Sequence, residues 1–175
     1  MKKVLLATLA ILSMVGTASA NIISSTVNIS TATSVQYFDF SVTTAGLFNI
    51  SAEGYTTLGV GYNVDPYIYL FSNSLSTANV IASEDDGGLG LNSLISNISL
   101  GLGDYILAIS EYDFSLSAAV SGNNEAEINS PGLILATISS QSGVATATNV
   151  HEPATLALFG LGLVGFAISR KRKQS

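Results

Sequence analysis

The sequence contains no cysteine and only one histidine, His151. Without cysteine the fold cannot be held by disulfides, so it must depend on its hydrophobic core. A nucleophilic triad needs a base beside the nucleophile, and histidine-based zinc sites need several histidines. Because His151 lies at the junction with the C-terminal segment, the body of the chain offers neither. We therefore expect a protein without enzymatic activity.

Basic residues are also absent from the body of the chain. All six Lys and Arg side chains lie in the two end segments, whereas every one of the 12 acidic residues lies between Asp39 and Glu152. Nucleic-acid binding depends on Lys and Arg contacts with phosphates, so no nucleic acid is expected as a partner. The carboxylates have no basic partners and must be solvated, hydrogen-bonded or bound to a metal ion.

The N-terminus has the three parts of a secretory signal peptide. Lys2 and Lys3 form a basic start, residues 4–15 form an apolar run, and Ala18 and Ala20 are the small residues of a cleavage site. The run has 12 residues, whereas an uncleaved membrane-spanning helix needs about 20. We therefore predict a helical signal peptide at 1–20, which the Sec export machinery recognises and signal peptidase removes.

A second apolar run, residues 154–169, lies near the C-terminus and is followed by a basic cluster, Arg170, Lys171, Arg172 and Lys173. As a helix this run spans about 24 Å, which is short for a hydrocarbon core of about 30 Å, so we predict a weak transmembrane helix. Basic residues beside a membrane segment stay on the cytoplasmic side. The body of the chain is therefore expected outside the inner membrane.

A short motif, formed by Glu152, Pro153, Ala154 and Thr155, leads into the glycine-containing apolar run at 156–168. Together with the run and the basic cluster, the motif resembles a PEP-CTERM sorting signal over residues 151–175, with His151 where the pattern has its first proline. The resemblance implies that a membrane-embedded peptidase, the exosortase, cuts near the motif. It also implies a membrane-anchored intermediate in a Gram-negative-type bacterium, followed by an extracellular or cell-surface product. A simple C-terminal anchor would show the same hydropathy and flanking charge.

The body of the chain predicts one all-β domain at 21–140, followed by a small, polar, flexible linker at 141–150. We expect about eight strands in an antiparallel β-sandwich or jelly roll, because short β-branched and aromatic segments alternate with Gly, Asn, Asp and Ser clusters. Alternating apolar residues at 38–42 and 48–52 predict a hairpin. Further strands are predicted at 67–71, 79–83, 93–100, 104–112, 114–119 and 132–138.

Four short motifs follow one another in the domain: Tyr-Phe-Asp-Phe at 37–40, Asp-Pro-Tyr-Ile-Tyr-Leu-Phe at 65–71, Glu-Asp-Asp-Gly at 84–87 and Leu-Gly-Asp-Tyr-Ile-Leu at 102–107. This series resembles the bacterial pre-peptidase C-terminal domain, a small β-sandwich attached to secreted enzymes. The resemblance covers about residues 35–120. It implies a non-catalytic accessory or adhesion-like module that is sometimes associated with calcium.

Hard oxygen ligands are densest at Glu84, Asp85, Asp86 and Asn92, with Asp65 at the start of a preceding predicted strand. Calcium prefers such ligands, so we predict a calcium site formed by Asp65, Asp85, Asp86 and Asn92. The alternative is a polar turn without a metal, since Asp-Gly is a common hairpin turn.

Tyr67 and Tyr69 share one face of a predicted strand, opposite Ile68 and Leu70. One of these faces is expected to be exposed, and exposed tyrosines can stack against sugar rings. Packing within the core is the alternative.

These features together predict an exported, exosortase-processed structural or adhesive component of the cell surface or of an exopolysaccharide matrix, such as a biofilm. A calcium- or carbohydrate-binding accessory module is the alternative.

Overall fold

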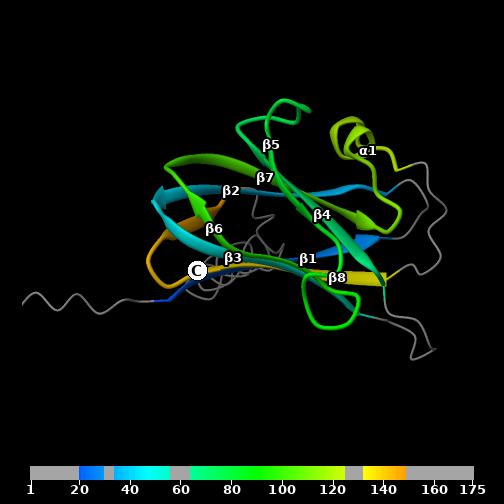
Figure 1. The fold of residues 1–175 in the computed structure, drawn as a ribbon, viewed down its shortest axis with the longest axis horizontal. Coiled ribbons are helices and arrows are strands. Elements are labelled where there is room, and N and C mark those ends of the chain that lie inside the picture. Colours follow the sequence, from blue (N-terminus) through cyan, green and yellow to red (C-terminus); the bar gives the residue numbers. More distant parts are fainter. Residues whose placement is uncertain (1–19, 30–33, 56–63, 125–131, 149–175) are drawn as a thin grey trace, which may run out of the picture.

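The computed structural model describes residues 20–29, 34–55, 64–124 and 132–148, which form two antiparallel sheets packed face to face (Figure 1). The four-stranded sheet has the order β1-β8-β3-β6, and the five-stranded sheet has the order β5-β4-β7-β2-β9. The all-β sandwich predicted from the sequence is confirmed. Its strands are β1 (Asn21–Ile29), β2 (Gln36–Thr44), β3 (Gly46–Tyr55), β4 (Pro66–Ser72), β5 (Val80–Glu84), β6 (Ser93–Leu100), β7 (Gly103–Glu111), β8 (Gly132–Ser140) and β9 (Val144–Ala147).

Strand pairing follows the nested scheme of a jelly roll. β4 pairs with β5, β3 with β6, β2 with β7 and β1 with β8, and all four pairs are antiparallel. The chain therefore behaves as one long hairpin that is rolled up, so that successive strands alternate between the two sheets except at β4 and β5. β9 is a further strand, added at the free edge of β2.

The hairpin predicted from residues 38–42 and 48–52 is wrong. These residues belong to β2 and β3, which lie in different sheets, so the turn between them carries the chain across the sandwich. Phe40 and Phe48 are both buried, at 0% and 1% exposure, because they face the same core from opposite sides. Alternation of apolar and polar residues fixes which face of a strand is buried, but it does not identify the neighbouring strand.

The inner faces of the two sheets form one continuous hydrophobic core. Ile50 and Ile138 from one sheet and Ile68 and Leu107 from the other are all 0% exposed. Each fully buried side chain of this size stabilises the fold by about 1.5–3 kcal/mol. Because the chain has no cysteine, this core replaces the disulfides that are common in small secreted domains.

Residues 116–121 form a short helix, α1 (Leu116–Ser121), where the sequence predicts a strand at 114–119. The Ser115 hydroxyl caps its first turn by accepting the N–H of Ala118 at 3.1 Å. Gly122 ends the helix in the left-handed conformation, with φ of 78°. These two caps favour a helical turn over a strand, although the segment is too short to show helical periodicity.

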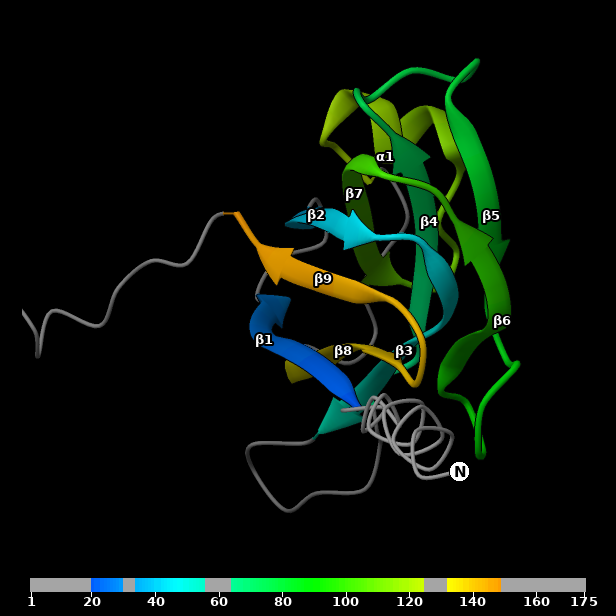
Figure 2. The same ribbon diagram turned by 90° about the vertical axis from the view of Figure 1, so that its left-hand side faces the viewer.

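The predicted linker at 141–150 contains β9 instead of being flexible throughout. β9 pairs with β2 and lies beside β1 on the open side of the sandwich (Figure 2). The Asn21 side-chain oxygen accepts the N–H of Ala145 at 2.7 Å, which joins the start of β1 to β9. This strand could not be predicted from the sequence, because it is short and consists mainly of small residues. Only Ala145 of its four residues is fully buried.

The predicted signal helix before Ala20, the predicted transmembrane helix at 154–169 and the basic cluster lie outside the described residues. Within the described ranges, no helix has the length and apolar character needed to cross a membrane.

The turn between β8 and β9 crosses the start of β3 with almost no space between the backbones. A methyl group added at Gly46 would lie 2.5 Å from the backbone nitrogen of Gly143. We therefore expect Gly46→Ala to lower the free energy of unfolding by about 1–3 kcal/mol, because the turn must shift. Gly101→Ala is the matched control, since nothing lies within 4 Å of its added methyl group. Urea unfolding of both variants measures the difference, and equal stabilities would contradict this close approach.

Candidate metal centre

Three predicted calcium ligands meet at one end of the β4–β5 pair. Asp65 directly precedes β4, and Asp85 and Asp86 directly follow β5. Because the two strands are antiparallel, with Ile68 opposite Glu84, the residues before β4 lie beside those after β5. Asp65, Asp85 and Asp86 each place a carboxylate oxygen within 4.8 Å of the other two. The structure thus brings together three of the four predicted ligands.

Two of these carboxylates have an oxygen that is shielded from water. Asp65 and Asp85 are half-buried, whereas Asp86 is exposed. The Oδ1 atoms of Asp65 and Asp85 are buried and accept no hydrogen bond from the described residues. An ionised oxygen in this position loses its hydration without a compensating donor, which is unfavourable. A cation bound between the carboxylates would supply the missing interaction.

The electrostatics of the cluster oppose the ionisation of Asp65 and Asp85 when no cation is bound. Burial, together with the negative charges of Asp85 and Asp86, raises the pKa of Asp65 to about 6. The pKa of Asp85 is also raised, first by burial and then by the charges of Asp86, Glu84 and Asp113. Sequence reasoning did not include Asp113, because it follows β7 and approaches Asp85 only through the fold.

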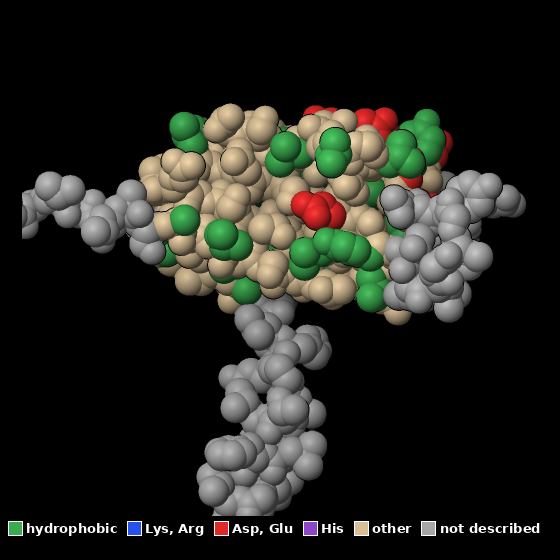
Figure 3. Space-filling view, turned by 90° about the horizontal axis from the view of Figure 1, so that it is seen from below, with side chains coloured by type: hydrophobic (Ala, Val, Ile, Leu, Met, Phe, Trp, Pro, Cys, Tyr) green, Lys and Arg blue, Asp and Glu red, His purple; other side chains and the backbone are tan. Residues whose placement is uncertain are grey.

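No basic side chain of the domain opposes these shifts, since residues 4–169 contain neither Lys nor Arg. The face of the four-stranded sheet seen in Figure 3 illustrates this composition: its described residues show acidic, hydrophobic and uncharged polar side chains, without Lys or Arg. The domain therefore has no Lys or Arg that could lower a carboxylate pKa through an ion pair.

Ser93 connects the strand ends that position the three carboxylates. Its fully buried hydroxyl lies within hydrogen-bonding distance of the carbonyl oxygens of Pro66 and, at 3.2 Å, of Glu84. It thereby connects the first residue of β6 to the start of β4 and the end of β5. No local pattern indicates this role, because a serine becomes a bridging group only when tertiary contacts bury it.

Asn92, the fourth predicted ligand, makes hydrogen bonds that stabilise the loop between β5 and β6. Its side-chain oxygen accepts the N–H of Gly54 at 3.0 Å, and its side-chain nitrogen donates to the carbonyl of Leu89 at 3.0 Å. Its backbone carbonyl also accepts the N–H of Gly88 at 2.7 Å. The structure therefore accounts for Asn92 through hydrogen bonds inside the protein and does not group it with the three carboxylates.

Tyr67 and Tyr69 lie on the outer face of the five-stranded sheet, with half-buried side chains whose ring centroids are 5.1 Å apart. Phe114 packs edge-on against both rings, and the Tyr69 hydroxyl donates to the Phe114 carbonyl at 3.1 Å. The pair thus belongs to a second hydrophobic cluster beneath α1. This packing explains the two tyrosines without a ligand, and sugar contact stays a prediction.

The C-terminal segment, which lies outside the described residues, contains the sequence that indicates how the protein is exported. A family model described as the PEP-CTERM protein-sorting motif matches residues 152–173. The chain carries a PEP-CTERM sorting motif. The resemblance predicted from Glu152, Pro153, Ala154 and Thr155 and from the basic cluster is confirmed. A PEP-CTERM motif is the mark of an exported exosortase substrate, and the chain is therefore one.

No curated protein matches this chain in sequence. Among solved structures, it is similar to the pre-peptidase C-terminal domain of a collagenase from Bacillus anthracis, with 16% identity and a TM-score of 0.45, over 67% of this chain and 89% of that one. It is also similar to a protein from Sulfurospirillum deleyianum, with 16% identity and a TM-score of 0.37, over 67% of this chain and 96% of that one. The first of these is the domain type that the body was predicted to resemble.

The raised pKa of Asp65 predicts an unusual pH dependence of stability. Between a pH of about 3.9, the pKa of an unfolded aspartate, and a pH of about 6, the folded state keeps a proton on Asp65 that the unfolded state releases. Without calcium, stability should therefore fall as the pH rises through about 6. Melting temperatures between mildly acidic and neutral pH, measured with a chelator present, test this.

Asp65→Asn is the informative variant for this dependence, because its side chain cannot titrate. Its melting temperature should vary less with pH than that of the wild type. A wild-type protein that becomes more stable from mildly acidic to neutral pH would contradict the electrostatic description of the cluster.

Proposed function

We propose that this exosortase substrate is a non-enzymatic structural or adhesive component of the cell surface or of an exopolysaccharide matrix. The observation that carries the proposal is the direct succession of a folded β-sandwich, described to residue 148, and a sorting motif that begins at residue 152. No further domain separates the two. The part that the sorting motif delivers outside the cell is therefore the sandwich itself.

The chemistry of the sandwich supports a role without catalysis. Residues 21–150 contain no histidine, cysteine, lysine or arginine. These are the side chains that most often activate a nucleophile, serve as a nucleophile or bind a developing negative charge. A domain that lacks all four is better suited to a binding or structural role.

Processing by the exosortase is the first test of this proposal. In an exosortase-deficient strain, we expect the chain to accumulate in the inner membrane with residues 154–175 still attached, because the apolar run is not removed. In the parent strain, we expect a product that begins at Asn21, lacks the basic cluster and fractionates with the cell surface or matrix. Cell fractionation and intact-mass measurement distinguish these forms. A surface product that retains Lys173 would contradict exosortase processing.

The structural role itself is tested by deleting the gene and measuring cell cohesion and matrix retention. Both should decrease and should return when the full chain is restored. A matched control restores a chain that ends at residue 150, which is exported but lacks the sorting motif. A deletion strain with unchanged cohesion and matrix would contradict a structural or adhesive role.

A second candidate function, calcium binding, is favoured by the buried Oδ1 atoms of Asp65 and Asp85, which accept no hydrogen bond from the described residues. The domain contains no Lys or Arg that could neutralise the three carboxylates, and Ca²⁺ is a cation of suitable ligand preference. Calcium would bind between the end of β5 and the start of β4 and would lock these strand ends together.

Calcium should raise the melting temperature of the folded domain, because binding to the native state alone stabilises it by about 2.7 kcal/mol at 100 times the dissociation constant. Asp65→Asn and Asp85→Asn should abolish this increase. Glu53→Gln is the control, since Glu53 is an exposed carboxylate on the other sheet. An unchanged melting temperature at millimolar calcium would remove this candidate, and so would an equal loss of the effect in Glu53→Gln.

A further inference from the structure

The described strands leave four sheet edges, which are β1 and β6 in one sheet and β5 and β9 in the other. An exposed edge can pair with a strand of another chain, and proteins usually protect their edges with bulges, charges or short strands. The pairing of β6 with β3 and that of β5 with β4 each contain a register shift, and β5 ends in Glu84. β9 has only four residues. Three of the four edges are thus protected in an ordinary way.

β1 has none of these protective features. Its nine residues pair with β8 in an unbroken register from Asn21 to Ile29. They include no charged residue, no proline and no glycine, and within the described ranges no strand pairs with the other edge of β1. β9 holds the start of β1 from that side, because the Asn21 side-chain oxygen accepts the N–H of Ala145 at 2.7 Å. The rest of β1 is a long, regular and uncharged edge.

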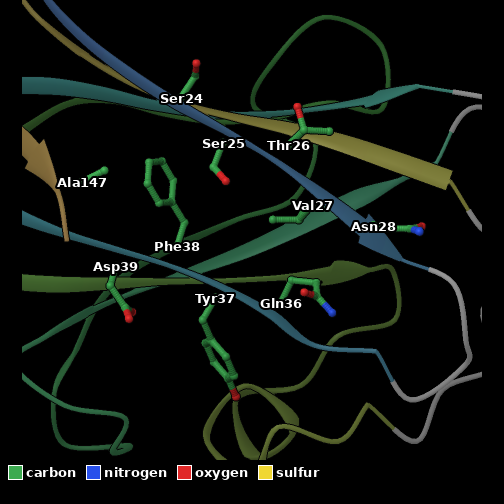
Figure 4. Close-up of a pocket in the computed structure, with 10 residues that line it drawn as sticks. All are labelled: Ser24, Ser25, Thr26, Val27, Asn28, Gln36, Tyr37, Phe38, Asp39 and Ala147. Carbon is green, nitrogen blue, oxygen red and sulfur yellow. The ribbon is translucent and has the colours of Figure 1, made fainter. Parts of the chain in front are cut away.

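A groove of about 750 Å³ lies beside this edge, between β1 and the first half of β2. Figure 4 shows that Ser25 and Val27 point into the space between the two strands, whereas Ser24 and Thr26 point away from it. All five residues from 24 to 28 line the groove. Because residues of both faces of β1 take part, the groove borders the edge of the strand as well as its inner face. A further strand can therefore approach β1 here.

The charge distribution indicates which strand fits this edge. All 12 acidic residues lie between Asp39 and Glu152, and residues 4–169 contain no Lys or Arg. Two copies of the domain therefore repel each other wherever their carboxylates meet. β1 and its neighbour β8 contain no acidic residue, so two copies can approach through this end of the four-stranded sheet. A basic partner would gain no attraction from an uncharged edge.

We propose that two copies of the exported domain associate by antiparallel pairing of β1 with β1 through residues 24–28, which joins their four-stranded sheets into one. A two-fold axis at Thr26 would place Thr26 opposite its own counterpart and Ser24 opposite Asn28 of the other copy. These three side chains are exposed on the outer face of the sheet. Their hydroxyl and amide groups would form hydrogen bonds across the new strand pair.

This pairing would satisfy the backbone groups of the one described edge that has no other protection. The exported product would then be a self-associating unit that presents two sandwiches in a fixed relative orientation. The inference goes beyond the structural or adhesive role proposed above and does not depend on it, because a dimer can form whether or not the protein contributes to a matrix. It is also independent of calcium binding.

Analytical ultracentrifugation of the exported product, isolated from the parent strain and measured with a chelator present, tests the pairing. The wild-type product should dimerise as its concentration increases. Thr26→Asp and Thr26→Lys should each weaken dimerisation at least about tenfold, because two like charges then face each other at the two-fold axis. An equimolar mixture of the two variants should dimerise again, because opposite charges then face each other.

Asn49→Asp is the matched control for the added negative charge. Asn49 is exposed on β3, two strands away from β1 in the same sheet. Its side-chain oxygen accepts the N–H of Asn97 at 2.8 Å, and an aspartate oxygen can accept the same hydrogen bond. This variant should dimerise as the wild type does.

Three results would overturn the proposal. The first is a wild-type product that remains a monomer at about 1 mM, a measurement that needs no variant to fold. The second is a dimer that both Thr26 variants leave intact, which would place the contact elsewhere on the molecule. The third is a mixture of the two variants that stays monomeric although both have the circular dichroism spectrum of the wild type, which would exclude a two-fold axis at Thr26.

Discussion

The contact between the inner faces of the two sheets is the interaction on which the rest of this structure depends. The chain has no disulfide to hold it and no Lys or Arg in the domain with which to form ion pairs, so burial of apolar side chains must provide the driving force for folding. The nested pairing of a jelly roll serves this purpose, because it places successive strands on opposite sides of one core. Phe40 and Phe48 show the result: they are close in sequence and approach the same interior from different sheets.

The same lack of basic residues controls the electrostatics of the surface. Carboxylates that would elsewhere meet a Lys or Arg must here be hydrated, protonated or bound to cations. Glu53, Asp104 and Asp113 are exposed to water. The fold instead gathers Asp65, Asp85 and Asp86 at the ends of β4 and β5 and shields two of their oxygens. The cluster is positioned by β4, β5 and Ser93 of β6, so its geometry is a consequence of core packing and not of the loop sequence alone.

The described part of the chain ends with β9 on the open side of the sandwich. A jelly roll leaves strand edges that could pair with other chains, and in this protein β9 covers part of the edge of β2 while Asn21 ties it to β1. The predicted mature N-terminus and the last strand before the motif therefore meet at one place. The two ends of the described sandwich are thereby joined, and its last described residue precedes the sorting motif at 152–173 by four positions in the sequence.

Local features of the sequence were enough to predict export and to establish that residues 21–150 lack histidine, cysteine, lysine and arginine. Signal and sorting segments are recognised through their own hydropathy and flanking charge, and the burial of strand faces follows from alternation, so both could be predicted without a structure. The grouping of Asp65 with Asp85 and Asp86 could also be predicted, because turns brought them near neighbouring strand ends. Only the tertiary structure decided that β2 and β3 occupy different sheets, that residues 144–147 form a strand, and that α1 forms where a strand was predicted. It also decided that Asn92 makes hydrogen bonds that stabilise its loop, and that Phe114 packs against Tyr67 and Tyr69. These features depend on contacts between residues far apart in sequence, and a local pattern carries no information about which distant partner a residue will meet.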